Sequence, residues 1–125
     1  MPLPNPYPFS ELVVSTKTAS VGASPAAAYC VAPCRGLIVR TYAVIEGTIT
    51  GTAAIAVGIN GGADIGTGAL AIAPGGAGSE ASDAPANANQ SARVNEGDVI
   101  SFSPAGAGGA NIPATFHVVI RERSL

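Results

Sequence analysis

The chain has 125 residues, which is the size of a single domain with one core. Only 11% of the residues are charged, six Lys or Arg and eight Asp or Glu, whereas a typical globular domain has about 25%. The basic residues form no cluster, which argues against a nucleic-acid partner, and Gly and Pro interrupt the uncharged stretches, which argues against a membrane-spanning helix. We therefore expect a soluble protein made in a cytoplasm, with a largely neutral surface that other subunits cover.

At the N-terminus, proline occupies every second position: Pro2, Pro4, Pro6 and Pro8. Proline fixes φ, lacks a backbone donor and forces the preceding residue into extended geometry, so neither a helix nor a central strand can form there. We expect a stiff, polyproline-like arm whose apolar side chains Leu3, Tyr7 and Phe9 contact a neighbouring subunit. The alternative is a disordered leader.

Residues 12–14 form the first predicted strand, and residues 15–25 a polar connector. The next run, YCVAPCRG, contains the two cysteines, Cys30 and Cys34. A structural zinc site needs four ligands, which two thiols and one distant histidine do not supply. We expect two small buried side chains on either side of a turn, with a disulfide formed in an oxidising medium as the alternative.

The strongest strand signal spans residues 36–46, where side chains of two kinds alternate. The predicted core face comprises Leu37, Val39, Thr41, Ala43 and Ile45. The predicted outer face comprises Ile38, Arg40, Tyr42, Val44 and Glu46.

Two further strands and a long loop follow. Residues 53–60 alternate with Ile55, Val57 and Ile59 on one face and end in an Asn-Gly-Gly turn that tolerates positive φ. Residues 69–73 form a weaker strand. Residues 74–90 form a loop with at most one edge strand, near residues 79–82.

The last two predicted strands are residues 99–103, after a turn at 95–98, and residues 115–121. The inward side chains of these strands are Ile100, Phe102, Phe116, Val118 and Ile120. Seven or eight strands at this spacing predict an all-β fold, an antiparallel β-sandwich of jelly-roll type with an extended proline-rich N-terminal arm. The predicted organisation is the arm and first strand at residues 1–14 and a single sandwich domain at residues 15–125.

The residue pattern gives little support to catalysis. His117 is the only histidine, so any Ser-His-Asp or histidine–metal site would depend on it, and we expect it on the outer face of the last strand. Asp64, Glu80 and Asp83 lie in predicted loops but lack the spacing of a calcium-binding loop. We therefore expect no enzymatic activity, no cofactor and no metal.

Four segments stand out together: CRG from residue 34, IAVGINGG from residue 55, VNEGDVISF from residue 94 and TFHVVIRE from residue 115. In outline they resemble the small decoration, or cement, proteins on the heads of tailed bacteriophages. The resemblance covers about two thirds of the chain and implies a jelly-roll subunit that sits on an icosahedral shell and clamps its capsomers. That family brings no catalytic residues with it.

We therefore expect a structural virion protein on the capsid surface, made in the host cytoplasm, that binds the major capsid protein. It should form a homo-oligomer, a trimer ahead of a dimer, and have no nucleic-acid or membrane partner. The expected capsid or partner contacts are Pro2, Leu3, Pro4, Pro6, Tyr7, Pro8, Phe9 and Leu12. The alternative is a receptor- or glycan-binding knob of a phage head or tail fibre, with its site in loops 60–68 and 74–90.

Overall fold

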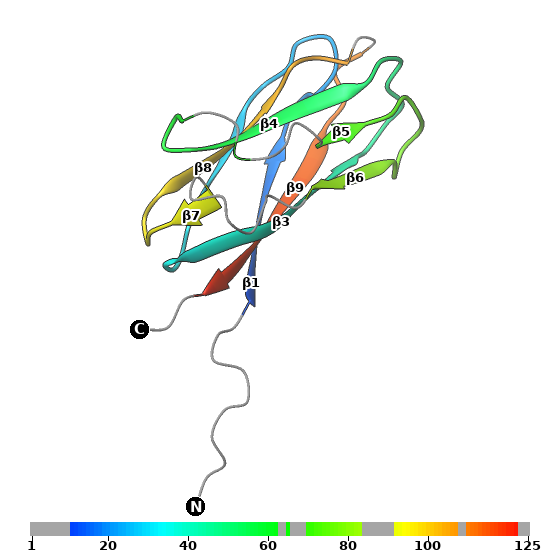
Figure 1. Cartoon of the computed structure of the whole chain (residues 1–125). Coiled ribbons are helices and arrows are strands. Elements are labelled where there is room, and N and C mark those ends of the chain that lie inside the picture. Colours follow the sequence, from blue (N-terminus) through cyan, green and yellow to red (C-terminus); the bar gives the residue numbers. More distant parts are fainter. Residues whose placement is uncertain (1–10, 63–64, 66–69, 84–91, 108–109, 123–125) are drawn as a thin grey trace, which may run out of the picture.

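The computed structural model describes residues 11–62, 65, 70–83, 92–107 and 110–122, which fold into two antiparallel β-sheets (Figure 1). Sheet A contains β1 (Glu11–Thr18), β9 (Ala114–Glu122) and β3 (Gly36–Ile45), and along the free side of β3 the short strands β6 (Glu80–Asp83) and β7 (Arg93–Val94). Sheet B contains β2 (Ala28–Val31), β8 (Val99–Pro104), β4 (Ala53–Ile59) and β5 (Ala71–Ile72). The predicted all-β class with antiparallel sheets is confirmed. The predicted N-terminal arm lies outside the described residues.

Strand pairing follows a nested order along the chain. β1 pairs with β9, β2 with β8, β3 with β6 and β7, and β4 with β5. Successive pairs alternate between sheet A and sheet B. The chain is thus an antiparallel double ribbon whose connections cross from one sheet to the other, except for β4 to β5 within sheet B and β6 to β7 within sheet A.

The core lies between the sheets, where each strand contributes every second side chain. Phe102 from β8 and Phe116 from β9 stack across the two sheets, with ring centroids 4.7 Å apart and planes 5° apart. Both rings are fully buried. The large side chains packed with them are mainly branched: Ile38, Ile45, Ile49, Ile65, Ile72, Ile100, Ile120, Val21, Val94 and Val118. Within the described residues there is no helix long and apolar enough to cross a membrane.

The predicted strands 36–46, 53–60, 99–103 and 115–121 are confirmed, because β3, β4, β8 and β9 match them to within one residue at each end. The loop that follows β5 contains β6 as the predicted edge strand. The first strand is longer than predicted: residues 15–18, assigned to a connector, continue β1 by pairing with β9. The strands β2 and β7 were not evident from the sequence.

The prediction for β3 is wrong in its first half. The register with β9 shifts between Ile38 and Arg40, which leaves Val39 as a β-bulge. As a result Ile38 is buried, whereas Leu37 and Val39 are only partly buried, the reverse of the predicted faces. Beyond the bulge the predicted core residues are buried: Thr41, Ala43 and Ile45.

Candidate interaction surface

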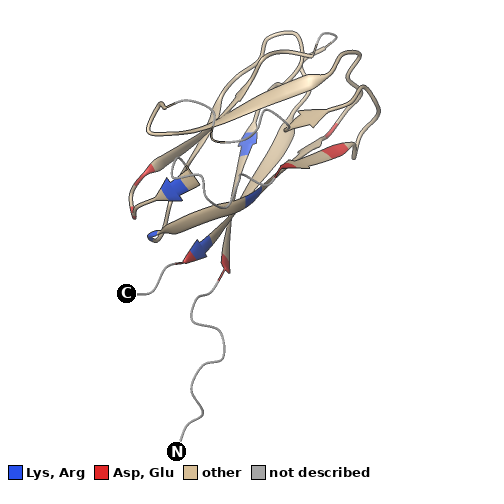
Figure 2. Ribbon diagram, viewed as in Figure 1, with Lys and Arg blue, Asp and Glu red and all other residues tan. Residues whose placement is uncertain are grey.

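Charged side chains are distributed unequally between the two sheets. The charged residues within described strands all belong to sheet A: Glu11, Lys17, Arg40, Glu80, Asp83, Arg93, Arg121 and Glu122. The strands of sheet B, β2, β4, β5 and β8, carry none (Figure 2). The low content of charged residues is therefore most marked in sheet B.

The outward side of sheet B is consequently neutral, and we call it the uncharged face. Its side chains are Tyr29, Val31, Ala54, Ala56, Ala71, Val99, Ser101 and Ser103. Three of them are large apolar groups that remain in contact with solvent: Tyr29 is 63% exposed, Val31 56% and Val99 37%. Val31 and Val99 are direct cross-strand partners, and Tyr29 is paired with Ser101. Tyr29, Val31 and Val99 therefore form one exposed apolar group.

The position of Val99 is fixed by the turn that follows β4. Asn60 has a positive φ of 52° and donates its backbone N–H to the Val99 carbonyl at 2.7 Å. The Asn60 Oδ1 accepts the Val99 N–H at 2.9 Å, and its Nδ2 donates to Asp98 Oδ1 at 3.0 Å. This end of the uncharged face is thus held by three hydrogen bonds from a single asparagine.

Asp98 also closes the turn before β8. Its Oδ2 accepts the backbone N–H of Asn95 at 2.8 Å, and its own N–H donates to the Asn95 carbonyl at 3.0 Å. The Asn95 N–H, followed by the Asn60 amide, lowers the pKa of the Asp98 carboxyl below its ordinary value of 3.8, because both groups stabilise the carboxylate. Gly97, two residues before the start of β8, has a φ of 91°, as the predicted turn requires.

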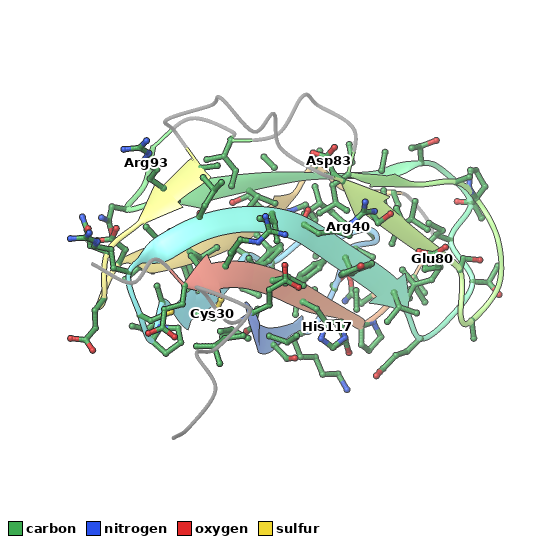
Figure 3. All side chains as sticks on the ribbon, turned by 60° about the horizontal axis from the view of Figure 1, so that its bottom comes forward. Cys30, Arg40, Glu80, Asp83, Arg93 and His117 are labelled. Atoms are coloured by element: carbon green, nitrogen blue, oxygen red, sulfur yellow. The ribbon has the colours of Figure 1, made fainter. Side chains whose placement is uncertain are left out.

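The outer face of sheet A carries charged and hydroxyl-bearing side chains beside the exposed Val13. Cross-strand register places Ser15, His117, Tyr42 and Ser82 in one row across β1, β9, β3 and β6. Ser15 Oγ lies 2.7 Å from His117 Nδ1, and Arg40 lies over the Tyr42 ring, 6.0 Å from its centroid. Figure 3 labels Arg40 and His117, which lie on the neighbouring strands β3 and β9. The predicted outer-face position of His117 is confirmed. These charged and hydroxyl-bearing groups distinguish this face from the uncharged face.

The Ser15–His117 pair does not form a catalytic triad among the described residues. A triad needs a carboxylate that orients the imidazole, and His117 is hydrogen-bonded to Ser15 alone among the described contacts. The pair also lies at the exposed surface of a sheet, where water has access to both groups. No group of three or more His, Cys, Asp or Glu within the described part of the chain could hold a metal ion. Of the predicted acidic loop residues, Glu80 and Asp83 lie on β6, and Asp64 lies outside the described residues.

Cys30 and Cys34 are unbonded and partly buried, and both pack against the core. Burial raises the pKa of the Cys30 thiol. Burial, followed by the nearby carboxylates of Glu122 and Glu96, raises the pKa of the Cys34 thiol. Both groups are therefore protonated near neutral pH, which fits the predicted role of small packing side chains.

Leu12 is the one predicted contact residue within the described residues; it lies on β1 opposite Ile120 and is 37% exposed. The other predicted contacts lie outside them: Pro2, Leu3, Pro4, Pro6, Tyr7, Pro8 and Phe9. The two loops of the receptor-binding alternative lie partly outside them as well.

Sequence reasoning did not single out Tyr29, Val31 and Val99. The run AYCV is apolar at all four positions, so the sequence contains no alternation that could identify its solvent-facing side without the partner strand β8.

No protein-family model matches the sequence, and no curated protein matches it at a significant level. Similar folds are found among solved bacteriophage capsids. A chain of the cyanophage Pam1 capsid asymmetric unit is 16% identical with a TM-score of 0.61, and the match covers 98% of this chain and 91% of that chain. A chain in the capsid of Ralstonia phage GP4 is 13% identical with a TM-score of 0.52, covering 98% and 91%. A chain in the acid-stable capsid of Helicobacter pylori bacteriophage KHP30 is 11% identical with a TM-score of 0.51, covering 91% and 89%.

Proposed function

We propose that this chain is a structural protein of a bacteriophage virion that binds the capsid shell from outside as a decoration, or cement, subunit and has no enzymatic activity. The observation that carries the proposal is the uncharged sheet B with its exposed Tyr29, Val31 and Val99. A solitary domain usually has a more charged surface, whereas the centres of protein interfaces are depleted in charge. Similarity of fold to chains of three phage capsids supports the choice of a virion as the setting.

The proposal includes a jelly-roll topology for a single sandwich domain that has β1 as its first strand and the N-terminal arm before it. A jelly roll is a double-sheet fold that joins two Greek keys. The nested pairs β1·β9, β2·β8, β3·β6 and β4·β5, which alternate between the two sheets, support this topology.

The arm at residues 2–9 is the proposed tether to the major capsid protein. It carries no charge, and its alternating prolines limit the entropy that the segment loses on docking. Its point of departure is fixed, because Arg121 donates from Nε at 3.2 Å and from Nη2 at 2.9 Å to Oε2 of Glu11 at the start of β1. A stiff segment that leaves from a fixed point presents Leu3, Tyr7 and Phe9 to one region of the shell.

Deletion of residues 2–9 tests the tether. We expect affinity for shells that lack the protein to fall by at least about tenfold, because the deletion removes the apolar contacts of the arm. Cosedimentation of the purified chain with shells, over a range of protein concentrations, measures the change. The thermal midpoint should stay the same, because no residue of either sheet is removed.

A second variant replaces residues 2–9 by eight Gly and Ser residues and so keeps the length of the arm. It should bind as weakly as the deletion, because stiffness and apolar side chains are lost together. Unchanged shell affinity of the deleted chain, with an unchanged thermal midpoint, would show that the arm is not the tether.

A further inference from the structure

We propose that the uncharged face is a self-association surface, on which two copies of the chain pack sheet B against sheet B about a two-fold axis. The contact would be isologous, since each copy presents the same residues to the other. The proposal concerns the isolated protein and does not rest on shell binding; with the uncharged face covered by a second copy, the arm at residues 2–9 would contact the shell.

The absence of charge on this face favours an uncharged surface as its partner. A charged side chain placed against it would lose its hydration without gaining an opposite charge, because the strands of sheet B contain none. A second copy presents an equally neutral surface, so no charge on the strands is buried by the contact. The outer face of sheet A differs, because packing it against itself would cover Arg40, Glu80 and Arg121.

The distribution of large and small side chains over this face favours a two-fold arrangement. Large groups lie on β2 and at the start of β8, where Tyr29, Val31 and Val99 are neighbours. Small groups lie on β4 and at the end of β8: Ala54, Ala56, Ser101 and Ser103. A two-fold axis that lies in the interface, parallel to the strands and between the two halves of the face, places the large half of each copy on the small half of the other. The face is therefore complementary in shape to itself.

The number of subunits follows from the geometry of the contact. An isologous interface uses one surface on each copy and closes with two subunits, whereas a trimer needs two different surfaces that meet head to tail. The proposal therefore specifies a dimer of the 12.2 kDa chain. Between the two oligomers expected from the sequence, this geometry favours the dimer over the trimer.

Replacement of Val31 by Glu tests the proposal, with Val13→Glu as the matched control. Both valines lie on edge strands and are similarly exposed, at 56% and 63%, but Val31 is on the uncharged face and Val13 on the outer face of sheet A. Sedimentation equilibrium should show that the wild-type chain is a dimer. The dimer dissociation constant should increase by at least about 100-fold for V31E and change by less than about threefold for V13E.

Tyr29→Ser provides a second, uncharged variant, which should weaken the dimer in the same direction if V31E proves poorly folded by circular dichroism. Three results would overturn the proposal. The first is a wild-type chain that stays monomeric up to about millimolar concentration, which means that association is weaker than about 4 kcal/mol. The others are a trimer, and equal weakening of the dimer by V31E and V13E. Neither loss nor retention of shell binding by the arm-deleted chain would change these outcomes, so the two proposals fail separately.

Discussion

Asn60 is the residue on which the start of β8 depends. Its positive φ turns the chain after β4, and its backbone and side chain both bind Val99. The Asn-Gly-Gly sequence predicted the turn, because asparagine and glycine tolerate this conformation. The contact with Val99 could not be predicted, because it joins residues that lie 39 positions apart in the sequence. Local patterns specify turns, whereas the partner of a turn depends on the complete fold.

Replacement of Asp98 by Ala should remove two hydrogen bonds and lower the free energy of unfolding at pH 7 by no more than about 1 kcal/mol, since the residue is partly exposed to solvent. The folded-state pKa of Asp98 lies below 3.8. Its contribution is therefore complete above the unfolded pKa and is lost as pH falls through the lower folded pKa. Urea unfolding at several pH values should show the wild type and D98A converging in acid.

Glu96→Ala, in the same turn, serves as the control for that experiment, because no hydrogen bond of the Glu96 side chain is among those described at the turn. The difference between wild type and E96A should be small at pH 7. A constant difference between wild type and D98A down to about pH 2 would contradict the assigned role of the carboxylate.

The bulge at Val39 shows what alternation alone cannot reveal about an element. Strong alternation predicted β3, β4, β8 and β9, because each carries several apolar residues at a period of two. It could not reveal an extra residue in β3, because the bulge is defined by the register with β9, about 80 residues later in the chain. The short strands β2 and β7 escaped prediction for the same reason, since their partners are distant.

Two single-residue deletions in β3 should have opposite outcomes. Deletion of Val39 removes the bulge and leaves Ile38 inward and Arg40 outward, so we expect a folded protein destabilised by about 1–2 kcal/mol. Deletion of Thr41 reverses the faces of the residues after it and turns Tyr42 and Val44 into the core, so we expect no cooperative unfolding transition. Thermal melting followed by circular dichroism distinguishes them. Equal stability of the two deletions would contradict the assigned bulge.

For the molecule as a whole, the organisation of charge was only half evident in the sequence. The 11% of charged residues indicated a neutral surface, but not that the strand-borne charges all belong to sheet A among the described residues. That segregation depends on which strands pair, and pairing joins distant segments such as β1 and β9. Of the contact residues expected from the sequence, Leu12 lies at the exposed edge of β1, whereas the uncharged face emerged only from the fold.

The most direct test of the proposed role on a capsid is cryo-electron microscopy of virus particles purified from the source whose genome encodes this chain, together with mass spectrometry of the same particles. We expect the polypeptide in the particles and density for the two-sheet domain at fixed positions on the outer surface of the shell. Absence of the polypeptide from the particles, or density for it only on a tail or fibre, would contradict a role on the capsid.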